Sequence, residues 1–146
     1  MPNWLYLFVS IAYHLGLALW IGGAVVLGAL VAPALFRALP RQEAAGIFGP
    51  ILRRFARLRL AAIAVVIAAA AVKHFVWEAH ASTVWILIRW IAIAFLAAAV
   101  LYEIYYLEGA LEARRGDPER FQPLHRRSEN LMKLSLLAAV VAAFLG

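Results

Sequence analysis

Long runs of apolar residues dominate the chain, and short segments between them hold most of the charge. A membrane-spanning helix needs about 20 mostly apolar residues. The pattern therefore predicts four spans, at residues 4–31, 60–77, 84–107 and 124–145. The fourth reaches spanning length only if it begins near Leu124 and the basic side chains that follow extend back to the interface.

The connection between the first two spans has a pattern of its own. Its apolar residues recur at helical spacing, with arginines around them: Ala44, Ile47, Phe48, Ile51, Leu52 and Phe55. Such a stripe is typical of a helix that lies in the headgroup plane, with Gly49-Pro50 as a candidate break. The alternative is an extension of the second span. We predict an all-α, integral membrane four-helix bundle with a short amphipathic interfacial helix between spans 1 and 2, all in one domain (residues 1–146).

Composition supports a membrane protein. Hydrophobic residues make up 66% of the chain and charged residues 15%, against roughly 25% charged in a typical soluble domain. The chain has no cysteine, which excludes disulfides and thiolate metal sites. The net charge of +6 comes from arginines beside apolar segments, so we expect anionic lipids as partners and no nucleic acid. The N-terminal Met-Pro-Asn-Trp lacks a basic region, so no cleavable signal peptide is expected.

The basic residues predict an orientation. None precedes the first span, the first and third connections are rich in arginine, and the second connection, residues 78–83, has none. The positive-inside rule then makes the first and third connections cytoplasmic and places both termini outside. Tryptophans mark the predicted outer boundary: Trp4, Trp77, Trp85 and Trp90. We expect the protein in a bacterial inner membrane.

Small residues recur along one face of the first span. They are Ala12, Gly16, Ala24, Gly28 and Ala32, and Trp20 interrupts the series. Small residues at this spacing let helices approach closely. The face is therefore a candidate for tight packing, and for the interface of a homo-oligomer or a larger membrane complex.

Ionisable residues at membrane depth are candidate functional residues because they are costly there. His14 lies near the middle of the first span. It is either a neutral histidine bonded to a neighbouring helix or an axial ligand of haem b or a metal ion. His74 is its one intramembrane partner, at a depth that differs by about 6–9 Å. No cofactor is predicted, and the haem or metal site stays as the alternative.

Charged residues at the helix ends suggest ion pairs. Glu103 lies near the cytoplasmic end of the third span, where it could meet Arg57 or Arg59. The pair would hold the helix ends together; the functional alternative is a proton or cation relay. Arg89 lies near the outer end of that span. The aromatic, acidic segment 102–108 indicates an interfacial girdle, or else a slot for a quinone or amphipathic ligand.

Several short motifs resemble those of the transmembrane-protein-205-like family, in the right order over nearly the whole chain. They are His14 with Trp20-Ile21-Gly22-Gly23, Pro33, Phe36, Leu39-Pro40-Arg41, Gly46, Arg53-Arg54-Phe55, Leu107-Glu108, and Phe121 with Leu124, His125 and Ser128. The chain departs from the family at Glu103 and Met132, where asparagines are expected, and at Gly109, where a proline is expected. The resemblance implies a four-helix membrane protein with no assigned activity. The run from His14 to Gly23 is also faintly similar to copper-resistance membrane proteins and to cytochrome b561-like bundles.

No arrangement of nucleophile, histidine and acid appears, nor a phosphate-binding glycine loop. We therefore expect no enzymatic activity. The leading hypothesis is an accessory, partner-binding or transport-associated membrane protein. The alternatives are a haem- or metal-binding redox or transport protein that uses His14, and a small oligomeric transporter.

Overall fold

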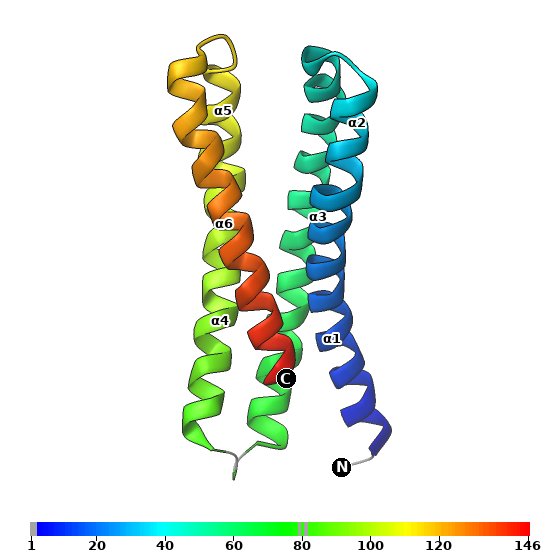
Figure 1. Cartoon of the computed structure of the whole chain (residues 1–146). Helices are drawn as coiled ribbons and strands as arrows, with labels where there is room; N and C mark the ends of the chain where they lie inside the picture. The colour runs from blue at the N-terminus through cyan, green and yellow to red at the C-terminus, as the bar shows by residue number, and fades with distance from the viewer. Residues whose placement is uncertain (1–2, 79, 81) are drawn as a thin grey trace.

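The computed structural model describes residues 3–78, 80 and 82–146 (Figure 1). The predictions for Met1, Pro2 and loop positions 79 and 81 lie outside this part. Regular structure in the described residues is helical throughout. The elements are α1 (Asn3–Val25), the π-helix η1 (Val26–Val31), α2 (Ala32–Ala38), α3 (Arg41–Val76), α4 (Thr83–Tyr102), the π-helix η2 (Glu103–Leu107), α5 (Glu108–Ala113) and α6 (Pro118–Phe144).

Three continuous helical stretches are long and apolar enough to cross a membrane: Asn3–Ala38, Arg41–Val76 and Thr83–Ala113. The fourth long helix, α6, carries charged residues through its first half, and it is not among the three. Large apolar side chains lie exposed on the outer surface, including Leu7, Phe75 and Phe144. Soluble monomeric proteins rarely expose so much contiguous apolar surface. Length and composition together indicate a membrane protein.

The helices form two pairs. α1 packs along α3, and α4 packs along α6, while α1–α6 and α3–α4 contacts join the pairs. Figure 1 shows the pairs close together toward the N-terminus and the α3–α4 connection, and apart at the opposite end. We call the first the loop end. The other, which holds the α2–α3 and α5–α6 connections, is the basic end.

The buried core occupies the loop-end half. Tyr13, Leu17 and Trp20 of α1 meet α3, α4 and α6 there. Gly16 makes the close approach possible, because a Cβ at this position would lie 2.7 Å from Val66 Cγ2 and 3.1 Å from the Ala62 carbonyl oxygen. The small-residue face of the first span therefore packs within the chain in the loop-end half.

The predicted interfacial helix is wrong. Residues 41–76 form one helix, and Pro50 lies inside it, so the alternative of an extended second span describes the protein. The apolar stripe of the segment finds partners in the same chain: Phe48 contacts Phe36 of α2 edge-on, with ring centroids 6.2 Å apart, and Ala44 and Phe55 are buried. Because these partners already cover the stripe, it does not have to be buried in the headgroup layer. The helix continues through Pro50 and loses only the backbone hydrogen bond that proline cannot donate.

The helices that contain the first three predicted spans are longer than those spans. They continue to Ala38, begin at Arg41 and continue to Ala113, respectively. These additions all lie at the basic end. Polar residues interrupt the apolar pattern at this end. A prediction from apolar length finds only the part of a helix that lipid would cover.

Candidate functional site

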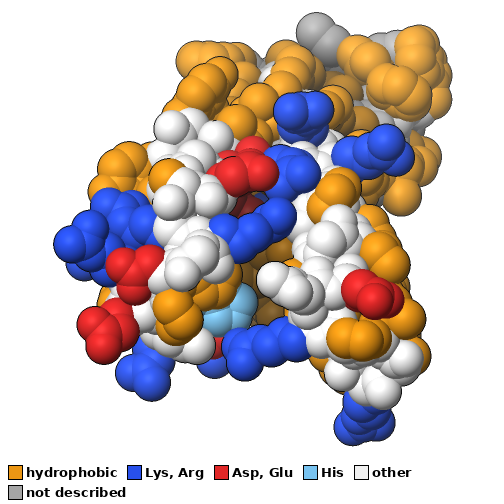
Figure 2. All heavy atoms as spheres, turned by 90° about the horizontal axis from the view of Figure 1, so that it is seen from above, with side chains coloured by type: hydrophobic (Ala, Val, Ile, Leu, Met, Phe, Trp, Pro, Cys, Tyr) orange, Lys and Arg blue, Asp and Glu red, His pale blue; other side chains and the backbone are white. Residues whose placement is uncertain are grey.

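A cavity of about 680 Å³ lies between the two helix pairs in the basic-end half. Its walls are apolar and come from both pairs, with Leu27, Leu52 and Phe55 on one side and Leu107 and Leu111 on the other. Figure 2, a view onto the basic end, shows basic and acidic side chains around a hollow with apolar atoms inside it. The volume falls within the range of small-molecule sites, about 300–1,000 Å³.

Each pair contributes a π-helical turn to this cavity. In η1 the backbone N–H of Ala32 donates to the Leu27 carbonyl, and in η2 that of Glu108 donates to the Glu103 carbonyl. Five residues of an α-helix turn through about 500°, so residues 103 and 108 would then point about 140° apart. The wider turn brings both side chains to the cavity. π-helical turns inside α-helices are frequent at functional sites.

A buried ion pair forms the inner boundary of the cavity. Arg59 Nη2 donates to Glu103 Oε1 at 2.6 Å, and the Arg59 side chain is only 1% exposed. The guanidinium lies over the rings of Trp20 and Phe55, at 5.2 and 4.9 Å from their centroids. Its Nη1 also reaches Met132 Sδ at 3.6 Å. The pair joins α3 to η2 and so links the two helix pairs. Arg57, the other expected partner, is exposed.

The mouth of the cavity carries further charges, and they are more exposed. Arg53 and Arg115 both direct guanidinium nitrogens toward Gly49. Arg53 Nη1 and Arg115 Nη2 lie 3.7 and 3.4 Å from the position that a Cβ would occupy at this glycine. Arg53 Nη1 also lies 3.8 Å from Glu112 Oε2. The position of Arg115, which follows α5, brings the second helix pair across to α3.

The small residues and the motif cluster of the sequence divide between core and cavity. Ala12 is half-buried, and Gly16 of α1 is buried against α3. Ala24, Gly28 and Ala32 line the cavity. His125 and Ser128 of α6 line it too. His125 Nε2 lies 3.4 Å from Glu129 Oε1. The sequence pattern therefore marked the wall of a cavity as well as a packing face.

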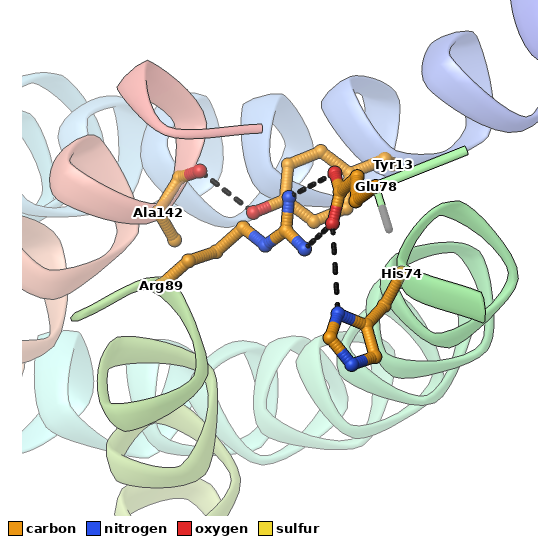
Figure 3. Close-up of polar contacts among 5 residues, drawn as sticks. All are labelled: Tyr13, His74, Glu78, Arg89 and Ala142. Carbon is orange, nitrogen blue, oxygen red and sulfur yellow. Dashed lines mark hydrogen bonds and ion pairs between the residues drawn. The ribbon is translucent and has the colours of Figure 1, made fainter. Parts of the chain in front are cut away.

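At the loop end a second polar cluster closes the bundle (Figure 3). The Arg89 guanidinium donates to both oxygens of Glu78, with 2.6 Å between Nη1 and Oε1. The Tyr13 hydroxyl donates to the Ala142 carbonyl at 2.6 Å. His74 Nδ1 lies 3.9 Å from Glu78 Oε2. The hydrogen bond from Arg89 lowers the pKa of the Glu78 carboxyl below its usual value.

Buried Lys73 belongs to the same end. Its ammonium lies over the rings of Tyr6 and Tyr13, 5.5 and 5.4 Å from their centroids. Cation–π contacts of this kind offset part of the cost of placing an ammonium away from water. The loop end is therefore held by contacts among α1, α3, α4 and α6.

The two histidines of the haem hypothesis have other neighbours. His14 is exposed on α1, and its Nδ1 lies 2.8 Å from the Ser10 carbonyl oxygen of the same helix. His74 is half-buried beside Glu78, with its ring edge-on to Trp90. Within the described part of the chain, no group of three or more His, Asp or Glu side chains is arranged to hold a metal ion.

Sequence reasoning missed the role of Glu78 and the cavity itself. A signal for Glu78 was present, because Arg89 within an apolar run requires a carboxylate and Glu78 is the one acidic residue of the short second connection. The cavity had no such signal. It depends on two π-helical turns and on how far the helix pairs diverge.

A family model described as "Domain of unknown function (DUF4149)" matches residues 15–119. The chain belongs to this family. The DUF4149 match contains both π-helical turns, Arg59 and Glu103, and it ends before His125 and Ser128. No curated protein and no solved structure matches the chain. The likenesses to the transmembrane-protein-205-like family and to copper-resistance proteins stay predictions.

Proposed function

We propose that this DUF4149 chain is a transport-associated membrane protein that binds one amphipathic small molecule between its two helix pairs. The observation that supports this proposal is the cavity of about 680 Å³, whose walls are apolar and whose inner end and mouth are charged. Apolar walls with a few placed polar groups are the usual composition of ligand sites. An amphipathic molecule complements both parts.

In this proposal α6 is the fourth span and both termini face outward. The basic end then lies on the cytoplasmic side, in agreement with the arginines of the α2–α3 and α5–α6 connections. Entry would be from the cytoplasmic side, where the pairs diverge, because the ion pairs and the core close the loop end. A protein that passes its ligand to a partner or to a transporter needs a binding site that is open on one side only.

The test compares two glycines of the first helix. Both glycines are exposed, and a Cβ at Gly28 or at Gly22 has no heavy atom within 4 Å. Gly28 lines the cavity and Gly22 does not. The full chain and its Gly28→Trp and Gly22→Trp variants are purified in mild detergent, and their bound amphiphiles are extracted and quantified by mass spectrometry. We expect one amphiphile enriched over the bulk lipid in the wild type and in Gly22→Trp, and lost in Gly28→Trp. Identical extracts from all three proteins would refute the proposal.

A further inference from the structure

The carboxylates of the cavity have unequal partners. Glu103 and Glu108 face the cavity from one helical stretch, through the π-helical turn between them. Glu103 Oε1 accepts the bond from Arg59. For Glu108, half-buried, the described residues provide neither a hydrogen bond nor an ion pair. Arg53, a neighbouring cation, faces Glu112 instead. Arg53, Arg57 and Arg59 attract the Glu108 carboxylate through space, but among the described residues no cation contacts it directly.

The surroundings of these carboxylates are apolar and aromatic. Phe55, Leu107 and Met132 line the same cavity. A carboxylate is costly in such a place unless an opposite charge or several hydrogen bonds compensate it. Aromatic faces also attract cations. The walls therefore favour a ligand with apolar groups, and the carboxylates favour one that carries a positive charge.

The guanidinium groups of Arg53 and Arg115 at the mouth favour a ligand of the opposite charge, an anion. They lie near Gly49, and an anionic headgroup would complement them. Arg53 is already opposite Glu112, however, and these two side chains are 35% and 60% exposed. Water and salt screen charges at such a place. Glu103 is only 14% exposed and Glu108 lies on the same π-helical turn, so we give these two carboxylates more weight than the mouth charges in the sign of the ligand.

We propose that the cavity binds a lipophilic monocation, such as an amine or an onium ion with apolar substituents, whose charge lies against Glu108 and Glu103. This inference rests on the proposed function and names the ligand class of the same site. Glu108 supplies the main attraction, and Glu103 supplies less because Arg59 already neutralises it.

The experiment uses two ions of the same size and shape and of opposite charge, tetraphenylphosphonium and tetraphenylborate. Saturable binding of each radiolabelled ion is measured on the full chain in mild detergent. We expect saturable binding of the phosphonium only, and at least a tenfold weaker affinity in Glu108→Gln. Glu108→Asp keeps the charge and retains most of the affinity, which separates loss of charge from misfolding. Glu119→Gln, on the exposed first turn of α6, serves as the control and binds as the wild type.

Each other outcome has a defined meaning. Equal or tighter binding of tetraphenylborate, lost in Gly28→Trp, would overturn the cationic assignment and leave the cavity as a ligand site. Phosphonium binding that survives Glu108→Gln unchanged would overturn it as well. Binding of neither ion would also overturn it, and the comparison of extracted amphiphiles from Gly28→Trp and Gly22→Trp would then decide the proposed function separately.

Discussion

Replacing Glu103 with alanine tests whether the Arg59–Glu103 pair holds the two helix pairs together. Arg59 is 1% exposed, and among the described residues Glu103 provides its one carboxylate contact, with 2.6 Å between Arg59 Nη2 and Glu103 Oε1. The substitution leaves a buried guanidinium without a counter-ion. Removal of one partner from a buried pair costs about 3–5 kcal/mol of stability.

Two features of the site modify this magnitude. The rings of Trp20 and Phe55 lie close to the guanidinium and remain after the substitution; cation–π contacts contribute about 0.5–2 kcal/mol each. Glu103 is also at the cavity, 14% exposed, where water can reach the vacated space. We therefore expect Glu103→Ala to lower the free energy of unfolding by about 2–4 kcal/mol.

The free energy of unfolding is measured for each variant by steric trapping in bicelles. Glu112→Ala is the matched control. Glu112 Oε2 lies 3.8 Å from Arg53 Nη1, with the Arg53 and Glu112 side chains 35% and 60% exposed, and solvent-accessible pairs contribute about 0.2–1 kcal/mol. The double variant Arg59→Met/Glu103→Leu removes both charges and should lie close to the wild type. A Glu103→Ala variant no less stable than Glu112→Ala would refute the reasoning.

Three further outcomes follow from the geometry. Gly16→Ala should destabilise the protein by about 1–3 kcal/mol, because its Cβ meets α3, whereas Gly22→Ala, with open space around it, should be neutral or gain about 0.5–1 kcal/mol; equal unfolding free energies would contradict the close approach. The pKa of Glu78 is lowered in the folded state, so its contribution to stability is complete above the ordinary carboxyl pKa and is lost as pH falls through the lowered value; Glu78→Gln should remove this acid-side dependence in unfolding titrations. Single cysteines in the cysteine-free chain should react with an impermeant maleimide from outside the cell at Ser82 and only after lysis at Arg115; the reverse result would invert the proposed orientation.

The helices of the membrane region could be predicted because each depends on local information. A run of apolar residues with helix-forming side chains has few alternatives in lipid, where every backbone polar group needs a partner within the segment. The segment around Phe48 and Phe55 was harder to assign. Its stripe fits a membrane surface and a neighbouring helix equally well, and partners distant from the stripe in sequence, such as Phe36 opposite Phe48, distinguish the two.

The candidate site was predictable in its parts and not in its arrangement. Glu103, Arg59 and Gly28 each stood out, since charges and glycines in apolar helices are exceptional. That Glu108 shares a wall with Glu103 could not be read from an α-helical spacing, because the five-residue interval requires the wider π-helical turn.

By itself, the amino-acid sequence determined the helical class, the membrane-length apolar stretches and the asymmetric distribution of arginine, since these depend on composition and on spacing along the chain. Only the tertiary structure decided that the helices pair as α1–α3 and α4–α6, that Arg89 pairs with Glu78, and that a cavity separates the pairs at the basic end. The physical reason is that cavities and buried ion pairs arise from the relative placement of several helices. That placement depends on contacts between residues far apart in the chain, such as the bond from Tyr13 to Ala142, which no local pattern records.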